Sequence, residues 1–197
     1  MKRSAAVLAV ALSSLAAPAA HAQPVSARSG PDTYLVLNLG AFLPLASDLD
    51  QLDPGVALSG TFGAMFSPYL GAEASLGYYR ASGTVGAAPL ALDTSLGVVP
   101  VLVNLRLVAP LKAMELSARA GGGIHFASRH TSSTGGASHS ATSTAFGWQL
   151  GAGAAFKLSP TMLVGLDVLA TFAEASFDGS STSLDGVTVG ATLGYRF

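Results

Sequence analysis

The amino-acid sequence predicts an all-β protein, a single eight-stranded antiparallel up-and-down transmembrane β-barrel. Three observations predict it. Apolar residues alternate with small or polar ones over segments of about ten residues, the pattern of a strand with one face in lipid. The chain has no run of the roughly 20 apolar residues that a membrane-spanning helix requires. Long and short spacers alternate between the segments, as in barrels with long external loops and short periplasmic turns.

The composition excludes several other classes of protein. Half of the 197 residues are hydrophobic and 11% are charged, whereas about a quarter are charged in an average soluble domain. The mean hydropathy of +0.50 is too high for a disordered chain. Ten basic and eleven acidic residues give a formal net charge of −1, so the basic surface that binds nucleic acid is missing. Because the chain has no cysteine, disulfides, thiolate metal sites and cysteine nucleophiles are also excluded.

The first 22 residues predict a cleaved signal peptide. Lys2 and Arg3 form a basic start, residues 5–15 are apolar, and Ala20-His21-Ala22 presents the small side chains that signal peptidase accepts. The apolar stretch is too short for the alternative, a retained transmembrane helix. We therefore expect cleavage after Ala22, a short lead-in over residues 23–32 and a barrel domain over residues 33–197.

Eight segments carry the alternating pattern. It is cleanest at the end of the chain, where apolar side chains alternate with glycine, threonine and arginine over the last eleven residues. The expected strands are Tyr34–Leu43, Val56–Phe66, Leu70–Tyr79, Gly97–Val108, Met114–Phe126, Ala145–Leu158, Met162–Ala173 and Val187–Phe197.

The spacers set the orientation of the barrel. Four are long, at Pro44–Gly55, Ala81–Ser95, Ala127–Ser143 and Glu174–Gly186. Three are short, at residues 67–69, 109–113 and 159–161. This alternation places both ends of the mature chain on the periplasmic side. In the third long spacer, the Ser/Thr/Gly-rich stretch His130–Ser143 predicts a mobile surface loop.

Closure of the sheet follows from the membrane environment. Hydrocarbon cannot hydrogen-bond a free strand edge, so the first strand must pair with the last. The alternative, a soluble lipocalin-like barrel, would carry apolar residues inside and charges outside. Here the charged residues fall on the parity opposite to the large apolar ones, which indicates that they face inward.

The C-terminal strand carries the most specific resemblance to a known family. It is similar to the β-signal that the outer-membrane assembly machinery reads, with Phe197 at the terminus and Tyr195, Leu193, Ala191 and Val189 at the alternate positions before it. From about residue 33 to 197 the chain resembles the small eight-stranded outer-membrane barrels, the OmpA/OmpX/OmpW-like membrane domains. The resemblance implies insertion by that machinery and a location in the outer membrane of a Gram-negative bacterium. It implies no specific activity.

Seven charged residues share the inward parity: Glu73, Arg106, Glu115, Arg119, Lys157, Asp167 and Arg196. Three acids against four bases make burial tolerable because each ion can find a partner. Arg106 and Glu115 flank one short turn on neighbouring strands, so we expect them to form an ion pair. Two interpretations stay open: a structural salt-bridge network that fills the lumen, and a gated or narrow pore, with space left by inward glycines.

Aromatic residues gather near the predicted strand ends. This placement predicts interfacial belts at the two membrane surfaces. Their main members are Tyr78, Phe126, Phe146 and Trp148 at the external end and Phe156 at the periplasmic end.

Enzymatic and metal sites are weakly indicated. His125 lies on the inward parity and His130 and His139 lie in the serine-rich third loop, but a triad needs an acid to orient the imidazole. Asp48, Asp50 and Asp53 in the first long spacer do not have EF-hand spacing. We therefore expect no catalytic residue, no metal site and no cofactor.

The functional expectation is an integral outer-membrane barrel with a structural or surface-interaction role. The alternatives are a narrow channel for ions or small apolar molecules, similar to the OmpW-like barrels, and a lipid A-modifying enzyme. The expected partners are outer-membrane lipids, lipopolysaccharide and the assembly machinery. We expect a monomer that does not bind nucleic acid.

Overall fold

The structure, a computed structural model, describes residues 32–49, 51–85, 92–133, 138–177 and 180–197. The predicted signal peptide lies outside the described residues, as does the lead-in apart from Asp32, which already belongs to the first strand. The elements are β1 Asp32–Pro44, η1 Ser47–Leu49, β2 Gly55–Met65, β3 Leu70–Val85, β4 Leu92–Pro110, β5 Met114–Ser133, β6 Ser138–Lys157, β7 Met162–Phe177, β8 Ser180–Ser183 and β9 Gly186–Arg196.

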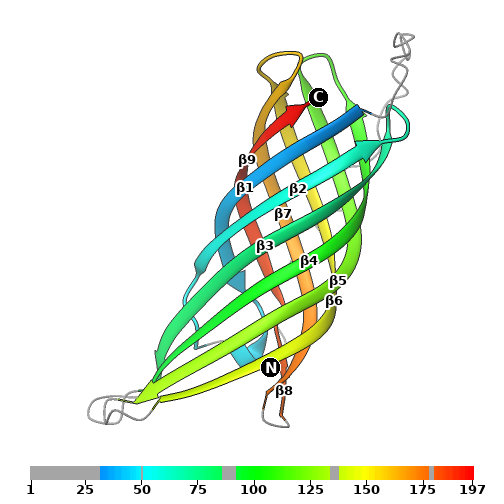
Figure 1. Ribbon diagram of the computed structural model, residues 1–197. Coiled ribbons are helices and arrows are strands. Elements are labelled where there is room, and N and C mark those ends of the chain that lie inside the picture. The colour runs from blue at the N-terminus through cyan, green and yellow to red at the C-terminus, as the bar shows by residue number, and fades with distance from the viewer. Residues whose placement is uncertain (1–31, 50, 86–91, 134–137, 178–179) are drawn as a thin grey trace.

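Eight strands close into a ring of antiparallel neighbours, which confirms the predicted barrel (Figure 1). The closing pair joins β1 to β9, with Tyr34 opposite Arg196 and Pro44 opposite Gly186. The short β8 pairs with the external end of β7, and β9 continues in the same register along the rest of β7, so β8 and β9 act as one interrupted strand. The C-terminus lies at the same end as the short turns (Figure 1).

Side chains alternate between the two faces of the wall along every barrel strand. On β4, Val103 and Leu105 are 65% and 60% exposed, while their neighbours Leu102 and Asn104 are buried. An exposed apolar face combined with a buried polar one is the arrangement of a strand that faces lipid. The wall therefore carries its large apolar residues outward, as the sequence pattern predicts.

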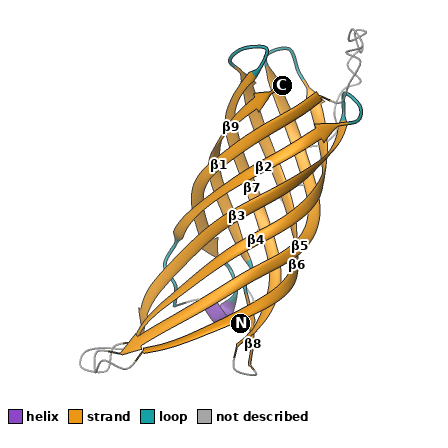
Figure 2. Cartoon of the chain, viewed as in Figure 1, coloured by secondary structure: helices purple, strands orange, loops and turns teal. Residues whose placement is uncertain are grey.

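The strands on one side of the barrel are longer than expected (Figure 2). Most of the predicted spacer Ala81–Ser95 and of the expected mobile loop His130–Ser143 belongs to β3, β4, β5 and β6. The loop prediction was wrong because the alternation of hydropathy stops where both faces meet water, whereas backbone pairing does not. The ladder continues there, for example with His130 opposite Ser95 on one side and Ser140 on the other.

The β3–β4 ladder is interrupted once. Leu76 pairs with Val101 and Tyr79 with Val98, but the two residues between them on each strand are not paired. Pro100 stands at this position, and proline has no N–H to donate to a neighbouring strand.

Candidate functional site

The seven predicted inward charges all point into the barrel, and they fall into two groups. Glu73, Arg106, Arg119 and Asp167 lie at mid-height in the lumen, where both acids are almost fully buried. Glu115, Lys157 and Arg196 lie near the short turns, where the two bases reach water.

The mid-height group centres on Glu73 of β3. Its carboxylate lies 3.5 Å from Nη1 of Arg106 and 3.4 Å from Nη1 of Arg119. Arg119 also forms an ion pair with Asp167 on β7. The two acids and two bases thus balance in charge and link β3, β4, β5 and β7 across the lumen. Buried ions in such a balanced arrangement avoid the cost of an unpaired charge.

Neutral polar side chains extend the group. The Tyr34 hydroxyl donates to Glu73 at 3.0 Å, and its ring lies 5.0 Å from the Arg106 guanidinium carbon. Asn38 of β1 donates to Asp167 at 3.2 Å. Gln149 donates to Asn104 at 2.7 Å. These contacts tie β1, β4 and β6 into the same layer, so the charged centre touches most of the wall.

The second group is more hydrated. Glu115 is buried and lies 3.3 Å from Nζ of Lys157, and it also pairs with Arg196. About a third of each basic side chain is exposed. The Arg196 contact joins β9 to β5 and therefore crosses the lumen.

The predicted ion pair between Arg106 and Glu115 is wrong. The register places Arg106 opposite Arg119 and Glu115 opposite Pro110, because the turn centres between Leu111 and Met114. Four residues along a strand separate Arg106 from the partner position of Glu115, about 13 Å. Two arginines therefore face each other across the β4–β5 ladder, and Glu73 binds both.

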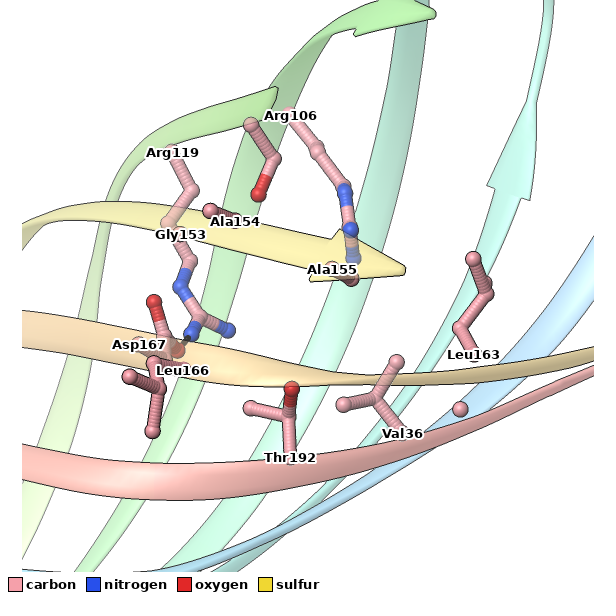
Figure 3. A pocket seen from close by; sticks show the side chains of 12 residues that line it. Val36, Arg106, Arg119, Gly153, Ala154, Ala155, Leu163, Leu166, Asp167 and Thr192 are labelled. Atoms are coloured by element: carbon pink, nitrogen blue, oxygen red, sulfur yellow. Dashed lines mark ion pairs between the residues drawn. The ribbon is translucent and has the colours of Figure 1, made fainter. Parts of the chain in front are cut away.

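A small cavity remains beside the charged centre (Figure 3). Its volume is about 30 Å³, room for about two water molecules. Small inward residues, Gly153, Ser117 and Thr192, leave this space, and Arg119 reaches across it to Asp167. Nε of Arg106 is buried without a hydrogen-bond partner among the described residues, so ordered water is the natural occupant.

The external half of the lumen holds an apolar cluster that the sequence reasoning missed. It includes Phe42, Tyr79, Val98, Phe177 and Leu184, of which Phe42, Val98 and Leu184 are 0% exposed. The rings of Phe42 and Tyr79 stack with centroids 4.3 Å apart. The signal was present, since Phe42, Tyr79 and Val98 lie on the inward parity of their strands. This cluster forms a second layer, on the external side of the charged one.

His125 lies inside this external half and is fully buried. Both of its ring nitrogens, like the Tyr79 hydroxyl, have no hydrogen-bond partner among the described residues. A histidine without an orienting acid or a solvent path lacks the two features that general-base catalysis needs. Its position matches its inward parity and indicates a packing role.

The exposed histidine His130 faces outward beside Ser140, with Nδ1 and Oγ 2.9 Å apart. Among the described residues no carboxylate is hydrogen-bonded to His130, and the nearby Asp93 accepts a hydrogen bond from Thr84 instead. No group of three potential metal ligands gathers in the described part of the chain. Asp50 lies outside the described residues, and Asp53 is exposed.

The predicted interfacial aromatics and assembly residues lie on the outer surface. Tyr78, Phe126, Phe146, Trp148 and Phe156 are all exposed. Trp148 stacks on Phe172 of β7 at 4.2 Å. The outward residues of the last strand are Val189, Ala191, Leu193, Tyr195 and Phe197.

Comparison with known families decides the class of protein. Residues 5–197 match the family described as "Outer membrane protein beta-barrel domain". The chain belongs to this family. As a member of this outer-membrane barrel family it is a transmembrane barrel of the Gram-negative outer membrane.

Solved structures of small outer-membrane barrels share the fold of this family member. Neisserial surface protein A has a TM-score of 0.58 at 12% identity, covering 84% of this chain and 97% of its own. OprG from Pseudomonas aeruginosa has a TM-score of 0.55 at 13% identity, with 85% and 96% covered. Ail, the attachment invasion locus protein of Yersinia pestis, has a TM-score of 0.54 at 16% identity, with 85% and 99% covered.

No curated protein matches the chain. Within the described ranges, no helix is long and apolar enough to cross a membrane.

Proposed function

We propose that this barrel has a structural or surface-interaction role in the outer membrane and that its lumen does not conduct. The observation that carries the proposal is the filling of the lumen at two heights. The charged centre around Glu73 occupies the middle, and the apolar cluster around Phe42 occupies the external half. A solute would have to separate ion pairs and displace buried rings in succession.

The dimensions of an eight-stranded barrel support this proposal. Such a barrel encloses little more than its own inward side chains. The cavity beside Asp167 has room for about two waters, far less than an aqueous channel. The outer loops and the projecting ends of β3 to β6 are then the parts available for contact with other molecules.

The partners follow from the same arrangement. The outward residues of the C-terminal segment, from Val189 on β9 to Phe197 directly after it, would be read by the assembly machinery after the signal peptide is removed. Outer-membrane lipids and lipopolysaccharide would surround the apolar wall of a monomer, and nucleic acid has no role. Contact with external molecules has a parallel in Ail, which was crystallised with the heparin analogue sucrose octasulfate.

Single-channel recording in planar bilayers tests the proposal. The refolded wild-type barrel should leave the bilayers silent at high protein load. A double variant, Phe42→Ala with Glu73→Ala, removes one central residue from each layer and should produce conductance steps if the layers are the barrier. Steps from the wild type would support the narrow-channel function instead and would overturn the proposal.

A further inference from the structure

The outer wall of β3 to β6 carries an open hollow of about 500 Å³ on its external half. Its lining includes Tyr78, Gly97, Phe126, Ser128, Thr142 and Thr144. The hollow lies where the β3–β4 ladder is interrupted at Pro100.

Strand pairing arranges the hollow in two rows. In the row nearer the membrane centre, Phe126 lies between Val99 and Thr144, and Tyr78 follows at the gap in the ladder. In the next row outward, Arg80 lies opposite Gly97, Gly97 opposite Ser128, and Ser128 opposite Thr142. The Ser128 hydroxyl donates to the Gly97 carbonyl at 3.5 Å. Two rings and several hydroxyls thus line the hollow, and Arg80 is the strand neighbour of its lining residue Gly97.

The absence of a side chain at Gly97 keeps the hollow open, although the surrounding atoms leave room for one. A Cβ at Gly97 would meet Oγ of Ser128 at 3.4 Å and the Tyr78 ring and hydroxyl at 3.6 to 3.7 Å, which are ordinary contacts. By contrast, a Cβ at Gly121 would collide with the backbone of β4. Gly121 is therefore explained by packing within the barrel, whereas packing does not explain Gly97.

The height of the hollow identifies what surrounds it. The next row toward the membrane centre consists of four exposed apolar residues, as in a wall that faces acyl chains: Leu76, Val101, Ile124 and Phe146. The next row toward the external end of the barrel consists of polar residues, as in a wall that faces water: Ser82, Ser95, His130 and Ser140. The hollow therefore lies at the boundary between acyl chains and headgroups of the outer leaflet.

The chemistry of the lining matches a phosphorylated sugar. Aromatic rings offer an apolar platform, and hydroxyls can exchange hydrogen bonds with sugar hydroxyls. Arg80 is exposed and makes no ion pair among the described residues, so its planar guanidinium is available for a phosphate. We propose that the hollow binds the phosphorylated sugar headgroup of an outer-leaflet glycolipid. The proposal rests on the proposed outer-membrane surface role, but it does not depend on whether the lumen conducts.

Two matched pairs of variants test the site. Gly97→Val fills the hollow, and Gly60→Val is its control, because Gly60 also faces outward with free space but lies on β2 away from the hollow. Arg80→Gln removes the guanidinium beside the hollow. Its control is Arg129→Gln, which removes another exposed base whose position on β5 has the inward parity. A shift between cold and boiled samples on an SDS gel establishes that each variant is folded. If Gly97→Val does not fold, the arginine pair decides alone.

The readout is retention of glycolipid in nanodiscs that contain phosphatidylethanolamine and a small fraction of bisphosphorylated rough lipopolysaccharide. Native mass spectrometry of the extracted barrel counts the bound glycolipid. Arg80→Gln should lower retention about ten-fold, the effect of losing one hydrogen bond to a charged group. Gly97→Val should lower retention by a similar factor because its side chain occupies the hollow, while both controls retain the wild-type amount. Dephosphorylated glycolipid should be retained by wild type no better than by Arg80→Gln.

Each outcome bears on one claim. Equal retention by the wild type, Gly97→Val and Arg80→Gln would overturn the site, as would equal losses in the variants and their controls. If the wild type gives conductance steps and glycolipid retention still falls in Gly97→Val and Arg80→Gln, only the proposal of a closed lumen is overturned. Silent bilayers with retention unaffected by the variants would overturn only the glycolipid site.

Discussion

Replacement of Glu73 by glutamine removes the centre of the mid-height ion-pair group while keeping its shape. The wild-type layer balances two acids against two bases, whereas Glu73→Gln leaves Asp167 alone with Arg106 and Arg119. The two arginines lie directly opposite each other on β4 and β5, so the loss also removes the carboxylate that bridges this like-charge pair. Glu73 is only 2% exposed and glutamine fills the same space, so bulk solvent cannot compensate for the missing charge. Removing one partner of a buried ion pair costs about 3–5 kcal/mol.

The assay uses the single tryptophan of the chain. Trp148 faces outward, so its fluorescence reports insertion into phospholipid vesicles during urea titration. The matched control is Glu115→Gln, whose partners Lys157 and Arg196 are about a third exposed and can be hydrated again. We expect the control to cost about 1 kcal/mol. If Glu73→Gln destabilises the barrel no more than Glu115→Gln, the charged centre is not a buried, mutually dependent group and the reasoning fails.

Three other variants probe separate features. Gly40→Ala should abolish the folded band on a cold SDS gel, because its Cβ would clash with the Val189 carbonyl. Its control, Gly60→Ala, should fold normally. Equal folding of the two variants would contradict the close approach of β1 and β9. His125→Leu should leave the urea midpoint unchanged or raise the unfolding free energy by about 1 kcal/mol, because it removes two unpartnered ring nitrogens; a clear loss of stability would point to an unseen partner. Phe197→Ala should lower the amount of barrel in the outer-membrane fraction of cells while refolding in detergent stays normal; an unchanged amount would remove Phe197 from the assembly signal.

The strands that cross the membrane were predictable because lipid imposes a period of two. Val103 and Leu105 face acyl chains while Asn104 between them cannot, so the sequence itself records which face is which. Beyond the membrane this constraint ends. Residues such as Ser132 and Ser138 are paired across β5 and β6, yet both faces there meet water, so their sequence resembles a loop.

The inward direction of the charged residues was predictable, but their partners were not. Arg106 and Glu115 flank one turn, yet the exact centre of that turn determines the register, and a short shift puts Arg119 opposite Arg106 instead. Contacts across the lumen, such as Arg196 with Glu115, depend on barrel closure and have no signal in local spacing. The apolar cluster around Phe42 did have a signal, because its members share the inward parity.

The most direct test of the account asks which face of the wall meets lipid. The chain has no cysteine, so single cysteines can be placed along β1 and labelled with a nitroxide without background. In refolded vesicles, labels at Leu35, Leu37 and Leu39 should collide readily with oxygen dissolved in the lipid, and labels at Val36 and Asn38 should be shielded from it. Alternation in this phase would establish a barrel with its charges inside. The opposite phase, or no alternation, would contradict the account and favour a soluble barrel with an apolar interior.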